Sequence, residues 1–145
     1  MNKILHLKKE HQKQVTNVEK EVFPNNWTSE QITLHFENKF SWNIGLLINN
    51  KIVSYSLCLF NSDYIEILRI GTLESYRSRG FASVLISNVE EFAIKKSIGK
   101  IQLELKENNK NAYKLYISKN FKIDSIRKKY YLKEKKDAIL MSKIL

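Results

Sequence analysis

Hydrophobic positions recur along this chain with two periods, and the changes between them divide it into short helices and strands. Spacing of three and four residues, typical of helices, occurs in four segments: 11–22, a segment capped by Thr28 or Ser29, 80–96 and 108–119. Alternating or continuous β-branched runs, typical of strands, occur in seven: 4–7, 42–48, 52–60, 64–70, 101–105, 121–131 and 138–145. The resulting order, β-α-α-β-β-β-α-β-α-β-β, predicts an α/β (α+β) fold with one mixed, mostly antiparallel sheet flanked by helices.

The length of 145 residues fits one domain over residues 1–145. No stretch reaches the roughly 18 apolar residues of a membrane span, and the basic-then-apolar start is too short for a signal peptide. Cys58, the only cysteine, excludes an intrachain disulfide, and its strand position favours core filling. We therefore expect a cytoplasmic protein that does not bind membranes.

The formal charge of +10 comes from 25 basic and 15 acidic residues. Because the lysines are spread along the whole chain, they favour solubility and a polyanionic ligand over a nucleic-acid surface. We expect no stable nucleic-acid complex. A basic nucleic-acid-binding domain without catalytic activity is the alternative function from another class. The three histidines do not cluster, so no metal site is expected.

A charged loop with one glycine separates the strand 64–70 from the helix 80–96. It reads Arg77-Ser78-Arg79-Gly80-Phe81-Ala82. The first amides of a helix have no internal partner and the helix dipole is positive there, so this loop can hold an anion such as a pyrophosphate. No Gly-x-x-x-x-Gly-Lys-Ser/Thr and no Gly-x-Gly-x-x-Gly occurs. An ordinary turn is the alternative interpretation.

This loop resembles the acetyl-CoA signature Arg/Gln-x-x-Gly-x-Gly/Ala of the GNAT N-acetyltransferases, and the element order resembles their fold. Residues 101–105 and 108–116 are similar to that family's Leu-Glu-Val…Asn-x-x-Ala-x-x-Leu-Tyr segment. Residues 126–131 and 137–141 resemble Arg-x-x-Tyr-Tyr…Asp-Ala-x-x-Met of its RimI branch, and residues 21–28 resemble that branch's Phe-Pro-Trp-Ser stretch. The family's usual Asp-Pro before the loop is Leu73-Glu74 here, and the branch's proline after Tyr-Tyr is Leu132.

The resemblance implies acetyl-CoA as co-substrate, without a metal. The implied cofactor-binding residues are Ile70, Gly71 and Thr72 along the pantetheine arm, then Ser78, Arg79, Gly80, Phe81, Ala82 and Ser83 at the pyrophosphate, and Asn109. Asn109 can also cap the helix that follows it.

The resemblance also implies Glu104 as the catalytic base and Tyr116 as the catalytic acid. By alternation Glu104 shares a face with Gln102, opposite Leu103. A solvent-facing Glu104 and a core Tyr116 are the alternatives without a catalytic role, and Glu66 is a rival base.

RimI enzymes acetylate the N-terminal alanine of a small-subunit ribosomal protein. The resemblance therefore implies that the partner of this protein is a protein or peptide N-terminus. A GNAT enzyme for a small amine and an acyl-CoA-binding module without activity stay as alternatives.

Overall fold

The computed structural model describes residues 2–131, 133 and 135–145. Its strands are β1 (Asn2–His6), β2 (Ser41–Ile48), β3 (Lys51–Phe60), β4 (Ile65–Thr72), β5 (Lys100–Lys106), β6 (Lys122–Tyr131) and β7 (Lys136–Ile144). Its α-helices are α1 (Gln12–Val22), α2 (Ser29–Glu37), α3 (Phe81–Lys95) and α4 (Lys110–Ser118), with short 3-10 turns at Lys9–His11 and Glu74–Tyr76. This order confirms the predicted one.

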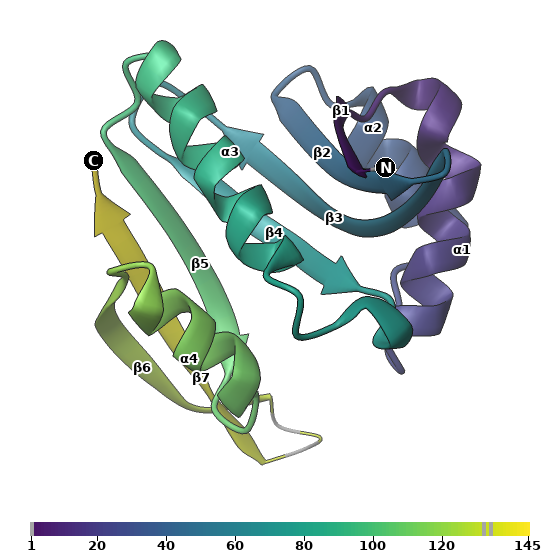
Figure 1. The fold of residues 1–145 in the computed structure, drawn as a ribbon. Helices are drawn as coiled ribbons and strands as arrows, with labels where there is room; N and C mark the ends of the chain where they lie inside the picture. Colours follow the sequence, from purple (N-terminus) through teal and green to yellow (C-terminus); the bar gives the residue numbers. More distant parts are fainter. Residues whose placement is uncertain (1, 132, 134) are drawn as a thin grey trace.

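All seven strands form one sheet in the order β1-β2-β3-β4-β5-β7-β6 (Figure 1). Every neighbouring pair is antiparallel except β4 and β5. Asn49 and Asn50 join β2 to β3 with φ angles of 50° and 64°. Positive φ at both central positions is typical of a type I′ hairpin turn, for which asparagine is well suited.

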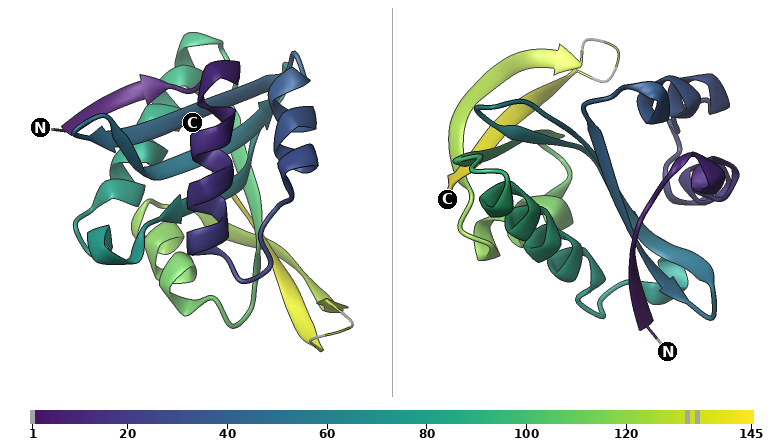
Figure 2. Two further views of the ribbon diagram at one scale, coloured as in Figure 1. Left: turned by 90° about the vertical axis from the view of Figure 1, so that its right-hand side faces the viewer. Right: turned by 90° about the horizontal axis from the view of Figure 1, so that it is seen from above.

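Helices cover both faces of this sheet. Figure 2 shows α1 and α2 on one face and α3 and α4 on the other. Against α1 and α2, one apolar cluster includes Val15, Val18 and Ile32, and against α3 and α4 a second includes Ile86 and Leu103. The first cluster also includes Phe81 and Leu85 of α3, so the two buried clusters together hold the sheet between its helices.

Two apolar side chains show where sequence periodicity succeeds and where it does not. Cys58 is buried in β3, as its predicted core-filling role requires. Leu34, an apolar residue of α2, is 68% exposed because it lies on the helix side opposite the buried Ile32. Among the described residues, no helix has the length and apolar character needed to cross a membrane.

Strands β4 and β5 separate towards their C-terminal ends, and this divergence creates the space for a site (Figure 1). Their parallel pairing runs only from Ile65–Ile101 to Ile67–Leu103. At the same level, the register between β3 and β4 shifts, so that Leu68 has no partner in β3. Such a bulge bends the strand that carries it. Beyond it, β4 pairs with β3 alone, which leaves the β5-facing edge of residues 68–72 without a strand partner.

Candidate active site

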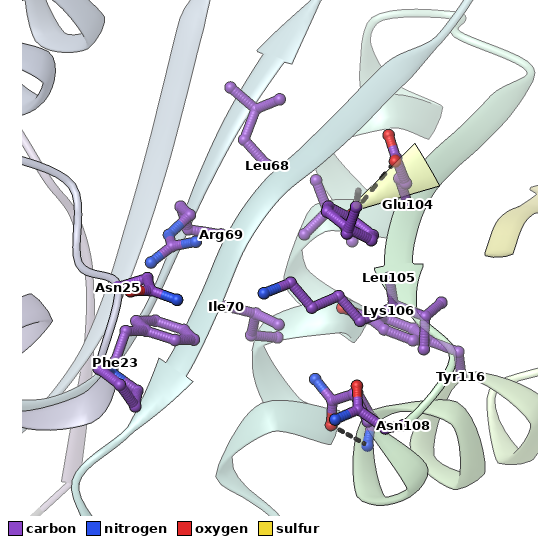
Figure 3. Close-up of a pocket in the computed structure, with 15 residues that line it drawn as sticks. Phe23, Asn25, Leu68, Arg69, Ile70, Glu104, Leu105, Lys106, Asn108 and Tyr116 are labelled. Atoms are coloured by element: carbon purple, nitrogen blue, oxygen red, sulfur yellow. Dashed lines mark hydrogen bonds between the residues drawn. The ribbon is translucent and has the colours of Figure 1, made fainter. Parts of the chain in front are cut away.

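A cleft of about 570 Å³ lies where β4 and β5 diverge (Figure 3). Its walls are the ends of these two strands, the segment between α1 and α2, and the start of α4. Figure 3 shows Phe23, Asn25 and Arg69 on one side, with Glu104, Lys106 and Tyr116 on the other. The cleft therefore gathers polar groups from segments that lie far apart in the sequence.

Glu104 stands at the β5 wall of this cleft. Leu103 and Leu105 are 4% and 6% exposed, whereas the side chain of Glu104 is exposed, which confirms the predicted alternation along β5. The hydroxyl of Tyr131 donates a hydrogen bond to Glu104 Oε1 at 3.1 Å. Glu66, the rival base, pairs with Gln102 in the closed part of the sheet and does not line the cleft. The geometry thus favours Glu104 as the carboxylate that meets a ligand.

Tyr116 reaches the cleft from α4 and is almost completely buried, with 3% of its surface exposed. Its ring packs edge-on against Phe121, with 5.3 Å between the ring centroids. Burial raises the pKa of the Tyr116 phenol well above its usual value, because the phenolate would lose its hydration. At neutral pH, Tyr116 is therefore a protonated group that can donate to a ligand.

The wall opposite Glu104 is organised by a buried carboxylate. Glu19 of α1 is fully buried, and its Oε1 accepts hydrogen bonds from the Tyr55 hydroxyl and from Arg69 Nε. Its Oε2 accepts from Arg69 Nη2 and from the backbone N–H of Trp27, the latter at 2.7 Å. The Arg69 guanidinium also lies 3.9 Å from the ring centroid of Phe23. Glu19 therefore joins α1, two strands and the segment before α2 into one wall.

Sequence reasoning missed Glu19 and Arg69, and it missed the hydrogen bond between Tyr131 and Glu104. One signal was available for Glu19, because it lies four residues after Val15 and so on the apolar side of α1. A charge at such a position needs a buried partner. Nothing in the local sequence identifies Arg69, 50 residues away, as that partner, nor Tyr131 as the partner of Glu104.

A second groove, of about 390 Å³, lies at the start of α3. Of the residues predicted at the pyrophosphate, the groove is lined by Ser78, Gly80, Phe81, Ala82 and Ser83, together with Thr72 from the predicted pantetheine segment. Gly80 precedes α3 with a φ of 79°, a conformation that favours glycine. Among the described residues no side chain caps this helix, so its first amides keep their hydrogen-bonding capacity for an anion.

The two loop arginines differ in position. Arg77 lines the groove, and its Nε donates to the Thr72 carbonyl at 3.1 Å. Arg79 does not line the groove. Its Nη2 donates to the Ser75 carbonyl at 3.3 Å, and its guanidinium lies over the ring of Tyr76. Arg79, one of the residues predicted at the pyrophosphate, therefore does not reach the groove, and of the two loop arginines only Arg77 adds positive charge to it.

The remaining predicted cofactor residues connect the groove to the cleft. Ile70 lines the cleft and Thr72 the groove, with Gly71 between them on the free edge of β4. A Cβ at Gly71 would come within 2.9 Å of Val22 Cγ1 and 3.0 Å of Phe23 Cε2, so glycine allows β4 to approach the end of α1. Asn109 lines the cleft and also caps α4, since its Oδ1 accepts from the Ala112 N–H at 3.3 Å.

The described residues include no cluster of three His, Cys, Asp or Glu side chains that could hold a metal ion. The anion groove, the free edge of β4 and the cleft follow one another along β4, and the cleft holds the carboxylate of Glu104 with the phenols of Tyr116 and Tyr131. This arrangement fits a phosphate-bearing ligand with an extended arm and a reactive end.

Comparisons with known proteins agree with this geometry. Residues 12–121 match the model of the Acetyltransferase (GNAT) family. The chain is 28% identical over 103 residues to the [ribosomal protein bS18]-alanine N-acetyltransferase of Haemophilus influenzae, covering 69% of this chain and 70% of that protein.

Two crystal structures share the fold. That of the ribosomal-protein-S18-alanine N-acetyltransferase from Escherichia coli superposes with a TM-score of 0.93 at 22% identity, over 99% of this chain and 94% of that one. That of Arabidopsis thaliana NAA60 in complex with acetyl-CoA gives 0.88 at 16% identity and covers both chains fully. With a family match over most of its length, this chain belongs to the GNAT family of acetyltransferases.

Proposed function

We propose that this protein transfers an acetyl group from acetyl-CoA to the N-terminal α-amine of a protein. The single observation that carries the proposal is the placement of Glu104 and Tyr116 in one cleft, next to an uncapped helix terminus. The bS18-alanine relatives support an N-terminal alanine of a small-subunit ribosomal protein as the acceptor. We also propose a cytoplasmic location, as the composition led us to expect.

The residues at the groove fit the cofactor. The first amides of α3 and the side chain of Arg77 offer hydrogen bonds and positive charge to a pyrophosphate. The free edge of residues 70–72 can pair with an extended pantetheine arm much as a strand would. When bound, acetyl-CoA supplies an acetyl group activated as a thioester. Backbone N–H groups at this edge are suited to stabilise charge that develops on the acetyl oxygen.

Glu104 and Tyr116 have complementary roles in this proposal. Glu104 accepts the proton that the acceptor amine loses, directly or through one water molecule. Tyr131, which donates to Glu104 Oε1, positions the carboxylate. Tyr116 carries its proton at neutral pH and can donate it to the sulfur that leaves. Two side chains on consecutive elements, β5 and α4, thus carry out the two proton transfers of the reaction.

An α-amine needs only a modest carboxylate base to become nucleophilic. Its pKa is about 8, against about 10.4 for a lysine side chain, so a useful fraction is already neutral near pH 7. Phe23, Pro24 and Asn25 form a wall against which the first residue of a peptide can lie. This favours a protein N-terminus over a lysine side chain.

The test is to incubate the protein with acetyl-CoA and matched acceptors, and to locate the acetyl group by fragmentation mass spectrometry. The acceptors are a peptide with an N-terminal alanine and an internal lysine, the same peptide with a blocked N-terminus, and spermidine. We expect acetylation of the α-amine alone, and none with the Gly80→Glu variant. Acetylation only of lysine or spermidine, or of no acceptor with the wild-type protein, contradicts the proposal.

A further inference from the structure

We propose that Lys114 is a second cationic contact for the diphosphate of the cofactor, acting from the opposite wall of the groove at the start of α3. The inference rests on the proposed function, because it assumes that acetyl-CoA occupies this groove. Lys114 belongs to α4, which the acetyl-CoA signature does not include. It lines the same groove as Arg77, Gly80 and Ser83.

The charges around the groove favour a dianionic group. Arg77 and Lys114 are its two cationic side chains, and no acidic side chain is found among the described residues that line it. Arg77 already uses its Nε for the Thr72 carbonyl. The α3 loop therefore offers backbone amides and part of one guanidinium, and the α4 wall adds a full positive charge.

Lys114 is the lysine of α4 whose position suits this contact. It is exposed and, in the part of the chain that the structure describes, its ammonium group is not engaged in a hydrogen bond or ion pair. Lys110 lies one turn earlier and does not line the groove, whereas the Nζ of Lys119 donates to Ser87 Oγ at 2.7 Å. A lysine ammonium on its long stem can follow a phosphate group without a fixed approach angle.

The experiment measures ligand affinity in Lys114→Gln and in the matched control Lys110→Gln. Both replacements remove one exposed charge from α4 and keep a residue with good helix propensity, so the fold is preserved. The ligands are CoA, dephospho-CoA, which keeps the diphosphate but lacks the 3′-phosphate, and pantetheine, which has no phosphate. Calorimetry at low and high salt serves the first two ligands, and an NMR titration serves pantetheine.

We expect Lys114→Gln to weaken CoA and dephospho-CoA equally, by roughly three- to fivefold at low salt, as for an exposed ion pair. The loss should shrink at high salt because exposed charges are screened. Pantetheine affinity should be unchanged, and Lys110→Gln should bind all three ligands like the wild type.

Unchanged CoA affinity in Lys114→Gln overturns the proposal. A loss with CoA that is absent with dephospho-CoA also overturns it, because the contact is then to the 3′-phosphate. An equal loss with pantetheine would show a structural effect and overturns it as well. If the wild-type protein binds neither CoA nor dephospho-CoA, the proposed function itself fails.

Discussion

Replacing Glu19 with glutamine should lower the free energy of unfolding more than any comparable surface change. Its two carboxylate oxygens accept four hydrogen bonds, two from the Arg69 guanidinium and one each from Tyr55 and Trp27. In glutamine one of these oxygens becomes an NH₂ group, which faces donors and cannot accept from them. The partner charge on Arg69 loses its counter-ion in the same step.

The expected loss is about 3 kcal/mol. Removing one partner of a buried ion pair typically costs about 3–5 kcal/mol. The lower end applies because the Arg69 side chain is 18% exposed and stacks on Phe23, so water and the ring compensate in part. The exposed Glu91–Lys95 pair is the matched control, and Glu91→Gln should cost less than about 0.5 kcal/mol.

Urea denaturation of the two variants and the wild type measures both losses. Where the NH₂ group takes the place of Oε2, the backbone N–H of Trp27 also loses its acceptor, so the wall formed by residues 23–25 should become less well positioned. We therefore expect the KM for the acceptor peptide to rise in Glu19→Gln while the affinity for acetyl-CoA changes little. A stability loss below about 1 kcal/mol would refute the idea that this carboxylate holds the wall together.

Three further predictions concern single residues. Gly80→Glu should abolish acetyl-CoA binding in calorimetry, because it places bulk and negative charge at the anion groove; unchanged affinity in the folded variant would refute that site. Burial lowers the pKa of His35, which donates to Asn43, below its ordinary 6.5. The neutral imidazole therefore contributes its full stability above pH 6.5, and this contribution is lost as the pH falls below that value. On acidification, the melting temperature of His35→Gln should fall less than that of the wild type. Melting temperatures of the two proteins that fall in parallel with pH would contradict this. Gly71→Ala should raise the KM for the peptide several-fold, because the new Cβ displaces Phe23, and an unchanged KM would show that this wall does not meet the acceptor.

The sequence predicted the elements because each is defined by local periodicity. The order of strands and helices, the alternation at Glu104 and the cap at Asn109 all depend on residues a few positions apart. The opening between β4 and β5 depends instead on where their pairing stops and where Leu68 interrupts the register with β3. No spacing rule in one segment contains that information.

Long-range pairing also explains what was missed in the site. Glu19 meets Arg69, and Tyr131 meets Glu104, only because separate elements pack together. The choice between Glu104 and Glu66 was open for the same reason, since both alternate with apolar neighbours along their strands. The structure distinguishes the two carboxylates by their surroundings. Glu66 lies where β4 and β5 are paired, whereas Glu104 lies beyond that pairing and lines the cleft.

The most direct test of the account is the rate of acetyl transfer to an N-terminal alanine peptide by Glu104→Gln and by Glu66→Gln. Both variants replace one carboxylate on neighbouring strands with its uncharged counterpart, so they are matched in chemistry. We predict that Glu104→Gln lowers kcat by about 10²–10⁴-fold, as expected for loss of a general base, with acetyl-CoA affinity unchanged. Glu66→Gln should remain close to the wild type. A Glu104→Gln enzyme with near-normal kcat, above all beside an inactive Glu66→Gln, would contradict the account.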